Sequence, residues 1–386
     1  MSYITKFPIK EFDALRTPFY FYDVRLLKDT LQAIRAEVPA DDTAFHVHYA
    51  IKANANPALL AIINSYGLGA DCVSGAEVQA ALDAGFPAEK IVFAGVGKRP
   101  DEIALGLKAG IGCFNVESIP ELEQINKLAI ELGCHARVAL RVNPNIDAHT
   151  HHYITTGLAE NKFGINLEQL ADVVNLCRSL SNVHLIGLHF HIGSQILDMD
   201  PFRLLCSKVN DLQDAFEARG IQLESINVGG GLGIDYEHPD EHPIPDFKPY
   251  FKVFRDGLKL RPGQSVHFEL GRSVVAQCGS LITRVLYVKE GVSKNFVIVD
   301  GGMTDLIRPA LYGAHHLIQN LSSDGETHTY DVVGPICESS DCFGHNELLP
   351  HTQTGDYIAL RSAGAYGECM ASRYNLRDLP GSMLYE

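Results

Sequence analysis

The sequence predicts an α/β protein in which a (β/α)8 barrel of the alanine-racemase-like kind is joined to a second, mainly antiparallel β domain. Between residues 46 and 270, eight short apolar segments alternate with segments whose apolar residues recur at helical spacing. After Arg272 the segments alternate apolar and polar residues, with few helical stretches between them, which is typical of an antiparallel sheet. We therefore expect residues 22–272 to form the barrel and residues 273–386, together with 1–21, to form the second domain.

The barrel strands are expected at 46–52, 69–73, 90–95, 112–116, 137–142, 184–190, 223–228 and 265–270. Helices are expected at 26–37, 57–66, 75–84, 100–109, 118–132, 167–180, 201–218 and 247–259. Two of these helices begin with a capping-box pattern, Ser74 with Glu77 and Ser118 with Glu121.

The second domain is expected to contain strands within 273–290, 295–300, 328–333 and 355–361. A short strand at 19–22 is expected to pair with a domain other than the barrel that follows it. The loop 236–246 is acidic and rich in proline, and we expect it to be exposed.

Composition narrows the class of protein. The chain has 386 residues, 46% of them hydrophobic and 20% charged, as in ordinary soluble globular proteins. No run of about 18 apolar residues is present, and the N-terminus lacks an apolar signal core, so we expect no membrane span. Nine cysteines without a C-x-x-C pair indicate a reducing compartment, the cytoplasm. A net charge of −15 without a basic cluster argues against binding to nucleic acid.

Active sites of such barrels lie at the carboxyl ends of the strands. The polar residues and glycines expected there are Lys52, Asp71, Asn115, Arg141, Asn143, His189, His191, Gly229, Gly230, Gly231, Glu269 and Arg272. Lys52 follows an apolar strand, and desolvation would lower the pKa of its ammonium group and free the amine for covalent chemistry. The alternative is a strand-end lysine that merely extends to solvent.

The glycine run 229–231 follows the seventh strand, where barrels often bind phosphate. Backbone N–H groups exposed by glycine can surround a phosphate, and the Ser194 hydroxyl could add a further donor. The alternative for such a run is a tight turn.

The His189-Phe190-His191 segment has three interpretations: a metal site, a ring stacked on a planar aromatic cofactor, or a structural histidine of the barrel. The other strand ends offer Lys, Arg and Gly, which are poor metal ligands, so no metal is expected. The cluster His149–His152 lies in a polar loop and is expected to be solvated. Glu269 could pair with a protonated pyridine nitrogen, or form a salt bridge with Arg272 or Arg141.

In the second domain, Arg308 could bind a substrate carboxylate with its planar fork of donors. Cys337 could donate a proton, although a buried, inert cysteine is the commoner case. Cys337 and Cys342 could also be read as a metal pair, but no partner pair accompanies them.

Five ordered motifs, at 49–54, 189–195, 229–233, 269–272 and 334–339, resemble those of the fold-type III pyridoxal phosphate (PLP) decarboxylases. The resemblance extends from about residue 17 to 370 and is greatest to the members that act on meso-2,6-diaminopimelate. It implies decarboxylation of that substrate to L-lysine and CO2, the last step of lysine biosynthesis.

The resemblance also implies roles for individual residues. Lys52 would hold PLP covalently, His191 would stack on its ring, and Glu269 would pair with the ring nitrogen. The groups implied at the phosphate are Ser194, Gly230, Gly231 and the backbone around Gly271 and Arg272. Those implied around Lys52 are Asp71, Glu77 and Arg141.

On the substrate side, the resemblance implies that Arg272, Arg308 and Tyr312 hold the distal carboxylate. Tyr366 would contact both cofactor and substrate. Cys337 and Glu338 would enter from the other subunit of a head-to-tail homodimer with shared active sites. There Glu338 would read the distal ammonium group, and Cys337 would protonate the product.

Two positions depart from the family pattern: Leu270 replaces a proline, and Ser340 stands where glycine is more usual. Related decarboxylases acting on ornithine, arginine or carboxynorspermidine are close alternatives. An amino-acid racemase would need a second base, usually tyrosine, where this chain has Cys337. A non-catalytic PLP carrier would not need the second domain or Arg308.

Overall fold

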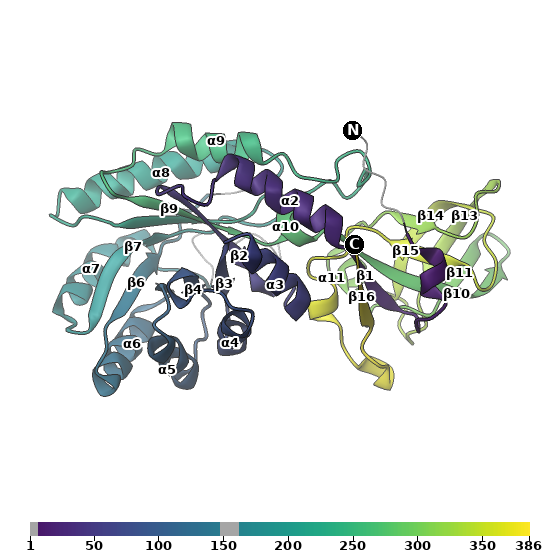
Figure 1. Ribbon diagram of the computed structural model, residues 1–386, viewed down its shortest axis with the longest axis horizontal. Helices are drawn as coiled ribbons and strands as arrows, with labels where there is room; N and C mark the ends of the chain where they lie inside the picture. The colour runs from purple at the N-terminus through teal and green to yellow at the C-terminus, as the bar shows by residue number, and fades with distance from the viewer. Residues whose placement is uncertain (1–6, 147–161) are drawn as a thin grey trace. The chain divides into compact units, whose positions relative to one another are not determined.

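The structure, a computed structural model, describes residues 7–146 and 162–386 (Figure 1). It divides into two compact units. The barrel unit consists of Leu31–Gly233 and Asp246–Gly271; the β unit consists of Met1–Thr30, Ile234–Pro245 and Arg272–Glu386. The predicted solvated cluster His149–His152 lies outside the described residues.

Eight parallel strands close into a barrel, which confirms the predicted fold. Each observed strand begins and ends within two residues of its predicted limits. The strands are β2 Phe45–Ala50, β3 Gly69–Cys72, β4 Ile91–Phe93, β5 Cys113–Val116, β6 Ala136–Arg141, β7 Val183–His189, β8 Ser225–Gly229 and β9 Ser265–Leu270. Most of their residues are buried, because helices cover parallel strands on the outside of a barrel.

The helices of this series are α2 Val24–Glu37, α3 Pro57–Ser65, α4 Gly75–Asp83, α5 Pro100–Ala109, α6 Ile119–Leu132, α7 Leu170–Ser179, α8 Asp200–Glu217 and α9 Phe247–Gly257. Ser74 and Ser118 cap α4 and α6 by accepting hydrogen bonds from the backbone N–H groups of Glu77 and Glu121, as predicted. These local signals explain why the sequence located the helix starts so well.

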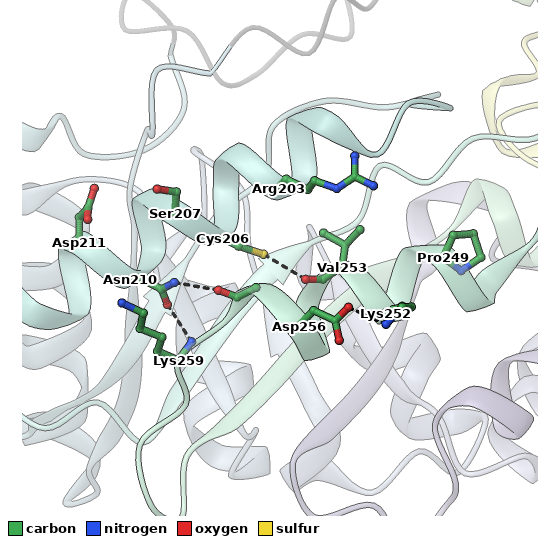
Figure 2. Close-up of a pocket in the computed structure, with 11 residues that line it drawn as sticks. Arg203, Cys206, Ser207, Asn210, Asp211, Pro249, Lys252, Val253, Asp256 and Lys259 are labelled. Carbon is green, nitrogen blue, oxygen red and sulfur yellow. Dashed lines mark hydrogen bonds and ion pairs between the residues drawn. The ribbon is translucent and has the colours of Figure 1, made fainter.

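Helices α8 and α9 pack side by side through aromatic rings, Phe202 against Tyr250 at 5.1 Å, and a buried amide also links them (Figure 2). Asn210 donates to the carbonyl of Gly257 at 2.8 Å and accepts from the backbone N–H of Lys259 at 2.9 Å. A groove lies between the helices, and two of its charged side chains, Lys252 and Asp256, pair with each other at 2.6 Å. The groove is therefore part of the packing between two helices of the barrel wall.

The β unit contains an eight-stranded sheet in the order β12-β15-β10-β11-β13-β14, with β1 paired to β10 and to β16. The strands are β1 Phe19–Asp23, β10 Gly279–Glu290, β11 Asn295–Val299, β12 Ile318–Asn320, β13 Thr327–Val333, β14 Cys342–Pro350, β15 Tyr357–Leu360 and β16 Gly381–Tyr385. Most neighbours are antiparallel, as predicted, although β1–β16 and β11–β13 are parallel. The pairing of β1 with this sheet, and not with the barrel, confirms the expectation for residues 19–22.

Three short helices, α1 Ile9–Phe12, α10 Arg272–Val275 and α11 Arg308–Tyr312, complete the β unit. Phe12 packs with Phe19, Phe21, Ile282 and Tyr357 in a buried cluster.

Over residues 7–146 and 162–386, no helix is both long enough and apolar enough to cross a membrane.

The expectation that loop 236–246 is exposed is wrong for part of the loop. Pro239 is buried, and Asp240 ion-pairs at 2.8 Å with Arg361, whose side chain is 2% exposed. Gln277 donates to the carbonyls of Asp235 and His242, at 2.9 and 3.0 Å. The loop belongs to the β unit, although barrel elements precede and follow it in the sequence.

Candidate active site

Lys52 lies two residues beyond β2, in a single 3-10 turn, Ile51–Ala53. Ile51 and Ala53 are fully buried, and the Tyr49 hydroxyl closes the turn by donating to the carbonyl of Asn54 at 2.8 Å. The Lys52 side chain itself is 35% exposed, so its amine is accessible although the residues on either side of it are buried. A partly desolvated amine of this kind is suited to covalent chemistry with a carbonyl group.

Asp71, at the end of β3, is the acid next to this amine. Lys52 Nζ donates to Asp71 Oδ2 at 3.3 Å, and the Asp71 side chain is fully buried. Burial and the nearby negative charge of Glu269 raise the pKa of Asp71 to about 8. Burial therefore favours the protonated form of this carboxyl group, and Lys52 opposes that effect.

Glu269, near the end of β9, is a buried carboxylate that stays ionised. Asn227 and Asn115 donate to its Oε1 at 2.7 and 3.2 Å, and His189 Nε2 lies 3.2 Å from its Oε2. Burial alone would raise the pKa of Glu269, but His189 and Lys52 more than offset this and hold the pKa well below its usual range. The predicted alternative, a salt bridge to Arg272 or Arg141, is not among its contacts within the described residues.

The two histidines of the His-Phe-His segment differ in their contacts. His189 ends β7 and contacts Glu269, whereas His191 Nδ1 accepts from the backbone N–H of Gly230 at 3.3 Å. Burial lowers the pKa of His191 well below its usual value, so its imidazole is neutral. Among the described residues, no three His, Cys, Asp or Glu side chains are grouped so that they could hold a metal ion.

The glycine run after β8 forms a turn that other residues could not adopt. Gly229 and Gly231 have φ values of +72° and +107°, in the region that favours glycine. A Cβ on Gly230 would lie 1.9 Å from the carbonyl oxygen of Glu269. Ile196 donates its N–H to the Gly231 carbonyl at 2.9 Å, which fastens the loop carrying Ser194 to this turn.

Gly271 allows the end of β9 to approach the turn that carries Lys52. A Cβ on Gly271 would meet the Cβ atoms of Ala53 and Ala50 at 3.0 and 3.1 Å. The sequence therefore brings Lys52, Asp71, Glu269 and the glycine turn together within the barrel unit alone.

Arg141, expected around Lys52, is held by a partner that the sequence did not reveal. Arg141 Nη1 donates to Glu117 Oε1 at 2.7 Å, and both side chains are at most 9% exposed. The backbone N–H groups of Gly95 and Gly164 also donate to Glu117, at 3.1 and 2.9 Å. Glu117 directly follows β5, so the rule that named Asn115 at this strand end could have found it.

Glu77, also expected around Lys52, anchors the start of its own helix. Its carboxylate accepts from the backbone N–H of Val73 at 2.7 Å. Burial raises the pKa of Glu77, and Lys52 is close enough to oppose that effect.

In the β unit, a tyrosine joins two of the predicted substrate-binding residues. Arg272 Nη1 and Arg308 Nη1 both donate to the Tyr236 hydroxyl oxygen, at 2.6 and 2.7 Å. The Tyr366 ring lies 4.9 Å from the Arg272 guanidinium carbon, and Tyr312 ends the short helix that begins at Arg308. The sequence did not single out Tyr236, because it lies in the loop that composition marked as exposed.

Cys337 and Glu338 lie on the surface of the β unit. Both are exposed, and Glu338 accepts from the Tyr374 hydroxyl at 2.7 Å. The backbone N–H of Cys337 donates to Asn375. Among the described residues, neither Cys337 nor Cys342 belongs to a group of three or more His, Cys, Asp or Glu side chains that could hold a metal ion.

The donors of the barrel unit fit PLP. They comprise an accessible amine on a rigid turn, a buried ionised carboxylate, and a glycine turn that can expose N–H groups. Residues 25–276 match the pyridoxal-binding domain of the pyridoxal-dependent decarboxylases. The chain belongs to this family, and PLP is its cofactor.

Individual relatives narrow the comparison. A diaminopimelate decarboxylase from Bacteroides thetaiotaomicron is 62% identical over 374 residues, which cover 97% of each chain. The crystal structure of diaminopimelate decarboxylase from Helicobacter pylori, complexed with L-lysine, has a TM-score of 0.91 at 42% identity and covers 98% of this chain and 94% of its own. A lysine/ornithine decarboxylase from Vibrio vulnificus shares the fold, with a TM-score of 0.83 at 21% identity over 98% of this chain and 96% of its own.

Proposed function

We propose that this chain decarboxylates meso-2,6-diaminopimelate to L-lysine and CO2, the last step of lysine biosynthesis, in the cytoplasm. The observation that carries the choice of substrate is the pair of guanidinium groups, Arg272 and Arg308, that meet at one oxygen in the β unit. Paired guanidinium groups suit a carboxylate, and this substrate retains a second carboxylate after it loses the first. Relatives that carry the name of this activity, 62% and 41% identical to the chain, support the same choice.

In the barrel unit, PLP supplies an electron sink for the electron pair that the departing CO2 leaves behind. Lys52 would hold the cofactor through its amine, which is 35% exposed on its turn. Glu269, kept ionised by its neighbours, would pair with the ring nitrogen and favour its protonated form. His191 would present a neutral imidazole to the ring face, while Ser194, Gly230, Gly231 and the backbone around Gly271 and Arg272 would hold the phosphate.

At the distal end of the substrate, Arg272, Arg308 and Tyr312 hold the carboxylate, and Tyr366 contacts both substrate and cofactor. In the sequence, Arg272 directly follows Gly271, the last residue of the barrel unit. We assign residues 22–272 to a PLP-binding barrel and residues 273–386, with 1–21, to a second, mainly antiparallel β domain.

The reaction consumes one proton for each CO2 released, and that proton must reach the α-carbon. We assign this donation to Cys337 of a second copy of the chain, and recognition of the distal ammonium group to Glu338 of the same copy. Both residues are exposed, as a contribution to a neighbouring subunit requires. The functional form is therefore a homodimer with shared active sites.

The test is to incubate the PLP-loaded protein with meso-2,6-diaminopimelate and measure lysine and CO2 together. One lysine per CO2 is expected, with no CO2 from ornithine, arginine or carboxynorspermidine. Exchange of the α-proton without CO2 release would instead indicate a racemase. Cofactor absorbance without turnover on any of these substrates would indicate a PLP carrier.

A further inference from the structure

We propose that Tyr236 is a positioning residue that determines specificity, because its phenolic oxygen holds Arg272 and Arg308 together as one reader of the distal carboxylate. This inference rests on the proposed function, which assigns the two arginines to that carboxylate. Tyr236 lies in the loop between β8 and α9, and none of the five sequence motifs includes it.

The contacts of Tyr236 are those of a shared anchor. Its oxygen accepts one hydrogen bond from each guanidinium group, at 2.6 and 2.7 Å, so both lone pairs are used. The Arg308 and Arg272 guanidinium carbons also lie 5.2 and 6.0 Å from the centre of the Tyr236 ring. One side chain therefore fixes both the spacing and the tilt of two planar donor groups.

The loop that carries Tyr236 is itself held in place. Gln277 bonds to two of its carbonyls, and the buried Arg361 bonds to Asp240. Within the loop, His242 Nδ1 lies 2.8 Å from Asp235 Oδ2, next to Tyr236 in the sequence. Since rigid support is what keeps a binding group in its productive orientation, the anchor is organised before any ligand arrives.

The charges around Tyr236 favour the same role. Two guanidinium groups repel each other, and an electron-rich oxygen between them offsets that repulsion. Burial would raise the pKa of Tyr236, but Arg272 and Arg308 outweigh it and lower the pKa. His316 packs edge-on to the Tyr236 ring at 5.3 Å, and burial lowers its pKa to about 3, so it adds no third positive charge.

A tyrosine in this position makes recognition depend on the carboxylate. A ligand with a distal carboxylate uses both guanidinium groups in one fixed orientation, whereas a ligand with only a distal amine does not use them. Removing the oxygen leaves the aromatic ring and its contact with the arginines, but each guanidinium group can then turn independently. Affinity should therefore fall only for ligands that carry the carboxylate.

The test uses the PLP-loaded full-length protein and the variant Tyr236→Phe. Binding of L-lysine, which keeps the carboxylate, is compared with binding of cadaverine, which lacks it, through the change in cofactor absorbance. We expect L-lysine to bind roughly 10- to 100-fold more weakly, as is typical when a hydrogen bond to a charged group is lost, and cadaverine to bind within about twofold of wild type. KM for meso-2,6-diaminopimelate should rise by a similar factor, while kcat changes less than about threefold.

Tyr357→Phe is the matched control, because Tyr357 also lies against a guanidinium group, that of Arg284, at 5.0 Å. Its hydroxyl donates to Asp13, away from Arg272 and Arg308, and its loss should leave both ligands unaffected. Equal weakening of L-lysine and cadaverine by Tyr236→Phe, or no weakening of either, would overturn the inference. If the wild-type protein forms no lysine, the proposed function fails, and the two binding measurements still decide the role of Tyr236.

Discussion

Replacing Arg141 by Gln should strongly destabilise the barrel unit, because it leaves the Glu117 carboxylate buried without its cation. The Glu117 and Arg141 side chains are 2% and 9% exposed, and their ion pair measures 2.7 Å. Breaking such a buried pair typically costs about 3–5 kcal/mol. Glu117 keeps two backbone donors, from Gly95 and Gly164, so we expect the lower end of that range, about 3 kcal/mol.

The same strand supplies the control. Arg137 on β6 pairs with Glu224 at 2.9 Å, but these side chains are 49% and 46% exposed. Arg137→Gln should therefore cost no more than about 1 kcal/mol. The chain has no tryptophan, so urea denaturation is best followed by circular dichroism. The double variant Glu117→Gln, Arg141→Gln should recover most of the loss, since no charge is then buried alone. Equal costs for Arg141→Gln and Arg137→Gln would refute the reasoning.

Three further predictions concern the cofactor site. Glu269→Gln should keep cofactor absorbance but slow CO2 release by about 100-fold or more, measured with labelled substrate, because the ring nitrogen loses its anionic partner. In the apoprotein, the raised pKa of Asp71 means that the folded state keeps a proton that the unfolded state loses near its ordinary value of 3.8. Stability measured by urea denaturation should therefore fall as pH rises from about 4 to about 8, and Asp71→Asn should flatten that slope. Gly230→Ala should raise the dissociation constant of PLP at least roughly tenfold, since its Cβ would lie 1.9 Å from a carbonyl oxygen, whereas Gly97→Ala, with no atom within 4 Å, should leave the constant unchanged.

The barrel and its strand-end residues could be predicted because the signals are local. Alternating apolar segments identify the strands, and parallel strands bring their carboxyl ends to one edge. Lys52, Asp71 and Glu269 follow from that rule alone. In the structure Lys52 donates to Asp71, and the charge of Glu269 acts on both of them. The helix starts were equally well marked, because a capping serine acts within four residues.

The parts that escaped prediction depend on contacts between distant segments. Tyr236 lies in an acidic, proline-rich loop, and only its partners Arg272 and Arg308 give it a role. Strand β14 alternates poorly between buried and exposed residues, so its pairing with β13 leaves little trace in its own sequence. Glu117 follows β5, so the strand-end rule could have named it, but its pairing with Arg141 on the next strand is visible only in the structure.

The most direct test of the account is to identify the lysine that carries the cofactor. The PLP-loaded protein is reduced with borohydride, digested, and mapped by mass spectrometry. We predict a pyridoxyl group on Lys52 and none on Lys98, whose fully buried amine already donates to Gly95, Asn115 and Glu121. A protein that stays unlabelled at Lys52, or that carries the label on another lysine, would contradict the account.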